Sequence, residues 1–153
     1  MIIKNNKVSS VLILAIGVGG LYFISTLLRP VEIVAVHQDG NFSDVLVNNF
    51  PLTNKGKIDW WLANKSMLKD RYDIPKPASY GAFTIVFWDF GDGYMEEGKY
   101  DRRCFEDMPP PVNCIEKNKE FTVKTGRDDE ILFGLHDGLY HLKKDGEIFK
   151  QRD

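Results

Sequence analysis

The sequence predicts an α+β fold: an N-terminal transmembrane helix, then a small, mainly antiparallel β domain with one packed amphipathic helix and a C-terminal three-stranded meander. Three observations support this fold class. An uncharged apolar run fills residues 8–28, one segment with helical periodicity stands among β-rich runs, and Asp-Gly pairs divide the end of the chain. The 153 residues suffice for one globular domain beyond the apolar run.

The apolar run is long enough to cross a membrane. Residues 8–28 form 21 positions without a charge, and at about 1.5 Å per residue a helix of that length spans roughly the 30 Å hydrocarbon core of a bilayer. A buried core helix so uniformly apolar would need apolar neighbours on every side. A cleavable signal peptide has a shorter run and a small-x-small site, which "LLRPVEIVAVHQ" does not offer. We therefore expect a signal anchor that stays in the lipid bilayer.

Basic residues set the expected orientation. Lys4 and Lys7 precede the run, whereas Arg29 is the only basic residue between the run and Lys55. Flanking positive charge stays on the cytoplasmic side. The predicted division for a bacterial inner-membrane protein is a cytoplasmic N-terminus at 1–7, a transmembrane signal anchor at 8–28 and a periplasmic α+β domain at 29–153.

Small residues within the run allow a second hypothesis. Ala15 and Gly19 have the small-xxx-small spacing, and Gly17 and Gly20 lie nearby. Such spacing lets two membrane helices approach closely, although glycine is common in membrane helices in general. A homodimer through the membrane helix is therefore one hypothesis.

The two cysteines stand in "CFEDMPPPVNC", residues 104–114. In the periplasm paired thiols oxidise and stay oxidised, and closing this loop disfavours the unfolded chain by about 2.8 kcal/mol in the loop-closure model. Three consecutive prolines stiffen the loop. A two-cysteine metal site would need C-x-x-C spacing or a nearby histidine, which the loop lacks. We expect a Cys104–Cys114 disulfide and a rigid exposed loop.

The charge balance argues against one class of partner. Residues 29–153 hold 18 basic and 22 acidic residues, a net charge of -4. Nucleic-acid binding requires a concentrated basic face. We therefore expect no nucleic-acid partner.

The first half of the domain predicts a hairpin and a helix. "VEIVAVH" (31–37) and "FSDVLVNNF" (42–50) are β-rich and flank the turn signal Asp39-Gly40. Thr53 or Asn54 can cap a helix, which "DIPKP" then ends. Its apolar positions recur at three- and four-residue steps: Ile58, Trp61, Leu62, Leu68 and Tyr72.

The two tryptophans of this helix have different expected roles. Trp61 lies on the apolar face and should pack against the sheet. Trp60, about 100° further around the helix, is either a half-buried boundary residue or a partner contact.

The second half predicts further strands. "AFTIVFWDF" (82–90) has no helical period and should be the central strand, covered on both faces. Gly91, Asp92 and Gly93 should turn it into the more polar strand "YMEEGKYDRRCF" (94–105), and "EFTVK" (120–124) is another strand.

The end of the chain predicts a meander with two-residue turns at Asp137-Gly138 and Asp145-Gly146. The strands are "ILFGLH" (131–136), "LYHLKK" (139–144) and "EIFK" (147–150). The expected core face carries Ile131, Phe133, Leu135, Tyr140 and Leu142; the partly solvated face carries Leu132, His136, Leu139, His141 and Lys143.

Candidate chemical groups do not form a diagnostic motif. "DFG" (89–91) matches a kinase motif, but the glycine-rich loop, strand lysine and catalytic-loop sequence that accompany it are missing. Oxygen-rich clusters suit calcium, but the spacing here is not that of an EF-hand, so solvated charge is the expectation for Asp89, Asp92, Glu96, Glu97 and Asp101. The spacing of the acidic residues does not select any pair of carboxylates for glycoside cleavage. The sequence also contains no motif of a catalytic nucleophile.

The histidines give a similarly weak signal. His136 and His141 share a strand face, and His37 could approach from the first strand to complete a zinc site. The pair has no diagnostic spacing, so we expect surface histidines at a strand rim, and neither a metal nor a cofactor. The residues that we expect to contact a partner are Trp60, Tyr80, Asp89, Asp92, Tyr94, Glu96 and Glu97.

Several stretches together resemble a known family. They are "RPVEIVAVHQDG", "NFPLTNKGKIDWW", "YDIPKPAS", "FWDFGDGYMEEGKYDRRCF" and "PPVNCIEKN". They resemble a family of proteins of unknown function from enterobacteria, classed as single-pass membrane proteins. The resemblance covers nearly the whole chain and implies an inner-membrane setting, but it supplies no catalytic residues.

The function that best fits these features is a membrane-anchored periplasmic binding protein without catalytic activity. Its protein partner would be a delivered toxin that it blocks as an immunity factor, because a rigid loop and an acidic surface suit a blocking role. The alternative is a structural or accessory component of an envelope assembly. An enzyme that uses the acidic or histidine cluster is a third hypothesis.

Overall fold

The computed structural model describes residues 6–153, so that residues 1–5, including Lys4 of the predicted cytoplasmic segment, lie outside the described residues. The chain divides into a first unit that ends at Pro30 and a second unit of residues Val31–Asp153.

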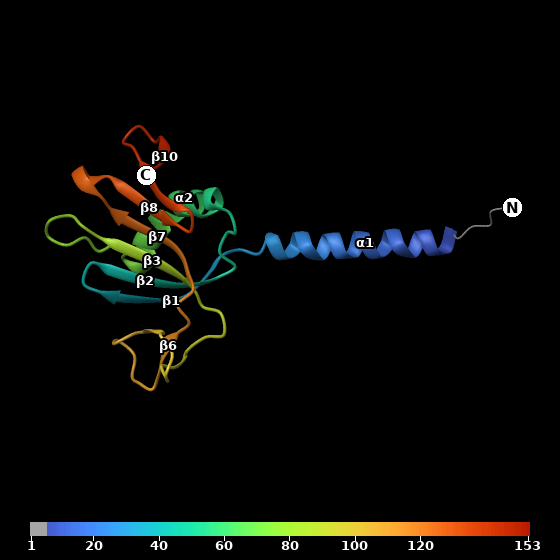
Figure 1. The fold of residues 1–153 in the computed structure, drawn as a ribbon, viewed down its shortest axis with the longest axis horizontal. Helices are drawn as coiled ribbons and strands as arrows, with labels where there is room; N and C mark the ends of the chain where they lie inside the picture. Colours follow the sequence, from blue (N-terminus) through green and yellow to red (C-terminus); the bar gives the residue numbers. More distant parts are fainter. Residues whose placement is uncertain (1–5) are drawn as a thin grey trace. The chain divides into compact units, whose positions relative to one another are not determined.

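The first unit is the helix α1, Asn6–Leu27 (Figure 1). Its segment Lys7–Thr26 is long and apolar enough to cross a membrane, and none of that segment is buried inside the protein. The Ser25 and Thr26 hydroxyls donate to the Tyr22 and Phe23 carbonyls of the same helix, each at 2.7 Å. These bonds satisfy two polar groups that water would otherwise have to solvate.

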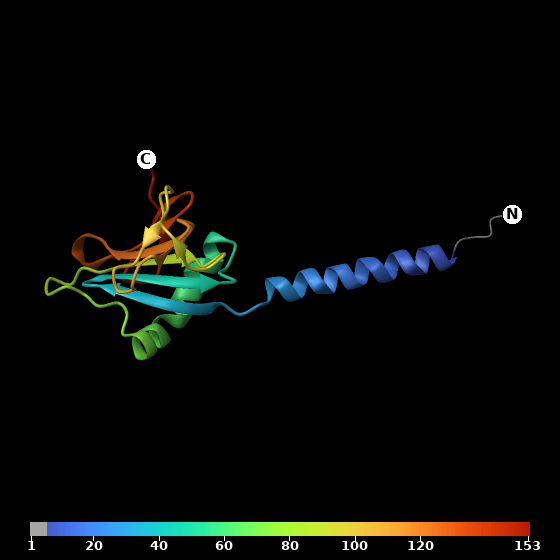
Figure 2. The same ribbon diagram turned by 90° about the horizontal axis from the view of Figure 1, so that it is seen from below.

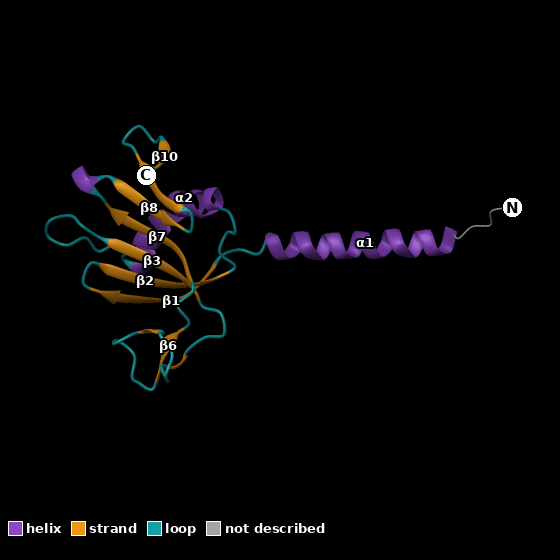
Figure 3. Ribbon diagram, in the orientation of Figure 1, coloured by secondary structure: helices purple, strands orange, loops and turns teal. Residues whose placement is uncertain are grey.

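Within the described residues, the second unit contains a seven-stranded and a three-stranded sheet (Figure 3). The larger has the order β1-β2-β3-β7-β8-β9-β10 and the smaller β4-β6-β5. The bounds of the larger sheet are β1 Glu32–Asp39, β2 Phe42–Asn48, β3 Thr84–Asp89, β7 Lys119–Thr125, β8 Ile131–Leu135, β9 Gly138–Leu142 and β10 Ile148–Lys150. The smaller sheet, called the small sheet below, comprises β4 Met95–Glu96, β5 Arg103–Cys104 and β6 Val112–Ile115. A single 3-10 turn, η1 Arg127–Asp129, precedes β8.

The predicted first hairpin is confirmed, with the turn one residue further along. β1 and β2 are antiparallel, and Asp39 pairs with Phe42. Gly40 and Asn41 are therefore the central turn residues, and Gly40 has φ 56°. Glycine at the first central position of a two-residue hairpin turn adopts this positive φ without strain.

The helix α2, Asn54–Tyr72, connects β2 to β3, and these two strands are parallel. The Thr53 side chain accepts a hydrogen bond from the Gly56 amide at 3.0 Å, which confirms the predicted cap. Asp73 ends the helix in the left-handed conformation, φ 53°. The remaining strand pairs are antiparallel, so the predicted fold class is confirmed.

Two cores lie on opposite faces of the large sheet. Alternate residues of a strand point to opposite faces: Val45 and Val47 of β2 pack with α2, whereas Leu46 packs with the small sheet. Figure 2 shows α2 and the small sheet on the two sides of the large sheet. On the α2 side four phenylalanine rings contact in series, with centroids 5.2 to 5.8 Å apart: Phe50, Phe87, Phe121 and Phe133. Trp61 packs edge-on against Phe133, as predicted.

The prediction of one polar strand at 94–105 is wrong. The segment forms two short strands, β4 and β5, on either side of the unpredicted β6. The central strand β3 already pairs with β2 on one edge and β7 on the other. No edge of β3 is left for a hairpin partner, so the segment after it leaves the large sheet.

The meander and its core face are confirmed, but its turns differ from the prediction. Leu135 pairs with Gly138, so His136 and Asp137 form the first turn. In the second turn the Gly146 amide donates to the Lys143 carbonyl at 3.0 Å and the Lys143 amide to the Glu147 carbonyl at 2.9 Å. These bonds close a three-residue loop with Gly146 at φ 91°, rather than a two-residue turn.

Candidate functional site at the small sheet

A polar network joins the large sheet to the small sheet. Its two buried members face each other across the first hairpin: His37 of β1 is 7% exposed and its partner Asp44 of β2 is 6% exposed. Both lie on the face opposite α2, since Val36 and Val45 beside them belong to the other core. Buried polar groups of this kind require hydrogen-bond partners. The small sheet and its loops supply them.

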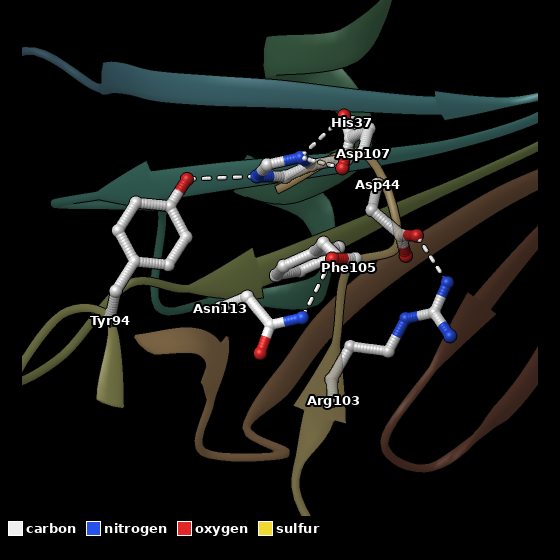
Figure 4. A network of polar contacts seen from close by, with 7 residues as sticks. All are labelled: His37, Asp44, Tyr94, Arg103, Phe105, Asp107 and Asn113. Atoms are coloured by element: carbon white, nitrogen blue, oxygen red, sulfur yellow. Dashed lines mark hydrogen bonds and ion pairs between the residues drawn. The ribbon is translucent and has the colours of Figure 1, made fainter. Parts of the chain in front are cut away.

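His37 is held on both ring nitrogens (Figure 4). Nδ1 lies 2.8 Å from each carboxylate oxygen of Asp107, and Nε2 lies 2.8 Å from the Tyr94 hydroxyl. A carboxylate only accepts, so Nδ1 carries a hydrogen that it donates to Asp107. The ring also stacks on Phe105, with centroids 3.9 Å apart. One imidazole thus joins β1 to two later segments of the chain, one at Tyr94 and the other at Phe105 and Asp107.

Tyr94 keeps its proton in this setting. Burial raises the pKa of its hydroxyl, and the nearby Asp107 carboxylate raises it further. The ring of Tyr94 packs edge-on against Phe90, with centroids 5.2 Å apart.

Asp44 forms the second half of the network. Its carboxylate accepts from Trp88 Nε1 and from Arg103 Nη2, each at 2.6 Å. Arg103 reaches it from β5, and its guanidinium lies 5.6 Å from the centroid of Phe105. Phe105, 3% exposed, and Ile115 fill the apolar space between the sheets. The small sheet is therefore fixed around an apolar centre by two polar contacts, each with its buried partner on the large sheet.

The disulfide lies within the small sheet. Cys104 and Cys114 face each other on β5 and β6, and their sulfur atoms are 2.08 Å apart, at bonding distance. Phe105 and Asn113 next to them are joined twice: the Phe105 amide donates to the Asn113 carbonyl and Asn113 Nδ2 to the Phe105 carbonyl, each at 2.9 Å. The disulfide and these two hydrogen bonds thus hold together the two ends of the loop that carries Asp107. The three prolines in it are exposed.

A cavity of about 190 Å³ opens beside the network. The bonded pairs Asp44–Arg103 and His37–Asp107 line it. Exposed residues on its rim are Asp39 and Glu106. The cavity is polar and carries more acidic than basic groups.

The family model described as "Enterobacterial putative membrane protein (DUF943)" matches residues 3–152. The chain belongs to this family. Its membership and the apolar, unburied α1 agree on a membrane protein with one candidate spanning helix within the described residues. No curated protein and no solved structure matches the chain.

In this family member the predicted contact residues do not form one patch. Trp60 on α2 is half-buried against Phe50 and Phe87, at 5.3 and 5.7 Å between centroids, on the face away from Tyr94. Tyr80 is 78% exposed in the loop before β3. Asp89 accepts from Asn118 at 3.3 Å. Asp92, Glu96 and Glu97 are exposed carboxylates at or next to the small sheet.

The prediction of surface histidines is wrong for His37, which is buried because Asp107 and Tyr94 bind it. The structure does not bring the three histidines together, since β1 and β9 occupy the first and sixth places in the sheet order. His141 binds Glu130 at 2.8 Å and Gln151 at 3.0 Å, while His136 is exposed. Within residues 6–153, no group of three or more histidine, cysteine or acidic side chains is placed to hold a metal ion.

Sequence reasoning missed Asp44, Arg103, Phe105 and Asp107. One signal was available: Asp44 and His37 interrupt the apolar runs "SDVLV" and "VAVHQ" of two neighbouring strands. A polar residue in such a run is buried with a partner or marks a site. The partners could not be predicted from the neighbouring sequence, because Arg103 lies 59 residues after Asp44 and Asp107 lies 70 residues after His37.

Proposed function

We propose that this chain is a single-pass protein of the bacterial inner membrane whose periplasmic domain binds a protein partner and has no catalytic activity. Residues 1–7 lie in the cytoplasm, 8–28 span the membrane and 29–153 lie in the periplasm. The partner is a delivered toxin, which the domain blocks as an immunity factor. The observation that carries the proposal is the small sheet: it is closed by a disulfide, fixed by buried contacts and rich in unpaired carboxylates.

Two features support the periplasmic location. The basic residues Lys4 and Lys7 precede the apolar run at 8–28, and Arg29 alone follows it closely, which favours a cytoplasmic N-terminus. Cys104 and Cys114 lie at bonding distance, and such bonds persist in oxidising compartments.

The rigidity of the small sheet supports binding rather than catalysis. Both nitrogens of His37 are engaged and its ring is almost inaccessible, so the imidazole has a structural task. A surface that is already ordered loses little conformational entropy when a partner binds.

The charge of the small sheet supports a basic partner surface. Residues 89–118 contain eight acidic and four basic residues. Three of the basic ones pair with carboxylates: Arg102 with Glu116, Arg103 with Asp44 and Lys117 with Asp101. Four exposed carboxylates remain without an ion pair among the described residues: Asp92, Glu96, Glu97 and Glu106. Such a surface accelerates association with a basic partner and disfavours acidic ones.

Competition between neighbouring cells tests the proposal. A strain without the gene is grown beside attackers that deliver a toxin, and beside the same attackers with delivery disabled. We expect the deletion strain to lose survival only against active attackers, and the gene supplied in trans to restore it. Equal survival across the attackers' toxins, together with stable envelope complexes in crosslinking pull-downs, would instead support an accessory component.

A further inference from the structure

Within the part of the chain that the structure describes, the outer edge of β1 has no partner strand. β1 is the first strand in the order of the large sheet and pairs with β2 alone. Among residues 6–153, no backbone hydrogen bond reaches β1 from its other side. An open edge of this kind is a template for an added strand. β1 is eight residues long and contains neither proline nor lysine, two common means of blocking an edge.

The backbone groups that face outward can be assigned. Asp39 and Phe42 close a two-residue turn and therefore form a hydrogen-bonded pair. Such pairs alternate with non-bonded pairs along an antiparallel ladder. The amides and carbonyls of Asp39, His37 and Ala35 consequently face β2, while those of Val36 and Gln38 face outward. The register shift between Ile33 and Ala35 ends this regular stretch.

The polar cavity lies next to this part of the edge. Gln38 and Asp39 of β1 belong to its lining, together with Glu106 of the disulfide loop. Asp44 and Asp107 at the cavity are already bonded to Arg103 and His37. Asp39 and Glu106 have no ion-pair partner among the described residues and are exposed. A cationic side chain brought there would therefore meet two free carboxylates.

We infer that β1 takes up an extended segment of a partner protein as an eighth strand of the large sheet, with a lysine or arginine of that segment in the cavity. This inference rests on the proposed function and names the chemistry of the partner: an extended, basic segment. Backbone hydrogen bonds at Val36 and Gln38 give affinity, and the cavity gives specificity. A second copy of this chain fits poorly, because β1 contains neither lysine nor arginine, so a paired β1 strand would bring no cationic side chain to the cavity.

The test uses full-length protein in lipid nanodiscs and a phage-displayed library of random dodecapeptides, with empty nanodiscs to remove lipid binders. We expect the selected peptides to be enriched in lysine and arginine. In hydrogen exchange, bound peptide should protect the amides of Val36 and Gln38 more than those of β10 at the opposite edge. Selection that yields no binders, binders without basic enrichment, or a protein that self-associates through β1 would overturn the inference.

Two variants and their controls complete the test. Glu106→Gln should weaken peptide binding about tenfold, whereas Asp70→Asn, an exposed carboxylate on α2, should not change it. Gln38→Pro, which removes an outward amide, should abolish binding, whereas Lys150→Pro at the other edge should not. Near-ultraviolet circular dichroism checks that the variants fold. If deletion sensitises cells but Glu106→Gln and Gln38→Pro still protect them, this inference fails and the proposed function stands. If peptides bind as expected but deletion of the gene has no effect on survival, the proposed function fails and the binding of a basic segment at β1 stands.

Discussion

His37 shows how one side chain can determine the position of a whole sheet. Its strand places it in the hairpin, but its contacts come from Tyr94, Phe105 and Asp107. Removal of the ring would take away its stacking on Phe105 and leave the half-buried Tyr94 hydroxyl without its partner, and an unsatisfied group costs more than its bond contributed.

We expect His37→Ala to lower the free energy of unfolding by about 3 kcal/mol. Tyr94→Phe, which removes the hydroxyl alone, should cost about 1 kcal/mol. The exposed His136→Ala is the matched control and should stay within about 0.5 kcal/mol of the wild type. Urea unfolding of the full-length protein in detergent, followed by tryptophan fluorescence, measures all three. Equal stability of His37→Ala and His136→Ala would contradict the structural role of His37.

His141 makes stability depend on pH. Hydrogen bonds to Gln151 and Glu130 raise the pKa of its imidazole above the ordinary value of 6.5. A raised folded-state pKa means that the stabilisation is complete below the unfolded-state value and is lost as pH rises through the folded-state value. His141→Asn should therefore destabilise the protein more at about pH 5.5 than at about pH 8.5, by less than about 1 kcal/mol because the site is partly solvated. An imidazole proton titration by NMR with a midpoint at or below 6.5 would contradict this assignment.

At the scale of single residues, only part of the candidate site could be predicted from the sequence. The cysteine pair could be predicted, because compartment and loop length both favour a bond. The burial of His37 could not, since it depends on side chains from two later segments whose positions only the assembled sheets define.

The small sheet is the element whose stability depends most on a single covalent bond. β4 and β5 have two residues each and β6 has four, so their ladders contribute few hydrogen bonds. The disulfide holds β5 to β6, while His37 and Asp44 attach the small sheet to the large sheet.

Replacement of both cysteines, Cys104→Ser with Cys114→Ser, should lower the free energy of unfolding by about 3 kcal/mol. Amide hydrogen exchange should accelerate in β6 and much less in the central strand β3. Wild-type protein treated with reductant serves as the control and should behave like the double variant. Exchange that accelerates equally in β3 and β6 would show that the small sheet is not a separate unit of stability.

Lys57 attaches α2 to the sheet. Its ammonium donates to the Glu120 side chain at 2.7 Å and to the Glu120 carbonyl at 3.0 Å, and its side chain is 11% exposed. Removal of one member of a buried pair leaves the other charge without compensation.

Glu120→Gln should therefore destabilise the protein by about 2 kcal/mol. The exposed pair of Lys55 and Asp59 on the same helix provides the control, and Lys55→Gln should cost less than about 0.5 kcal/mol. Thermal unfolding monitored by circular dichroism compares the two. Equal effects would indicate that the Lys57 ammonium is solvated.

Most elements of the larger sheet could be predicted from the spacing of the apolar residues and from the turn residues. Two β-rich runs around Asp39-Gly40 predicted the first hairpin, alternation predicted the core face of the meander, and Thr53 or Asn54 predicted the start of α2. The exact turns could not be predicted, because Asp-Gly at Asp137 permits a two-residue turn at either of two positions. The small sheet was missed for another reason: strands of two residues have no periodicity, and they form because β3 has no free edge.

At the scale of the whole molecule, an apolar helix and a disulfide-containing domain share one chain. The family to which the chain belongs agrees with the membrane setting of the helix. The side of the membrane on which residues 29–153 lie determines whether the cysteines meet oxidising conditions and whether a delivered toxin can meet the domain. This location is the central claim of the proposed function.

The most direct test is a pair of reporters fused after Asp153 in the native cell. Alkaline phosphatase is active only in the periplasm and green fluorescent protein exported in unfolded form is not fluorescent there. We predict active phosphatase, a dark fluorescent fusion and full-length protein in the membrane fraction. Fluorescence with inactive phosphatase, or a shortened chain free of the membrane, would contradict the account.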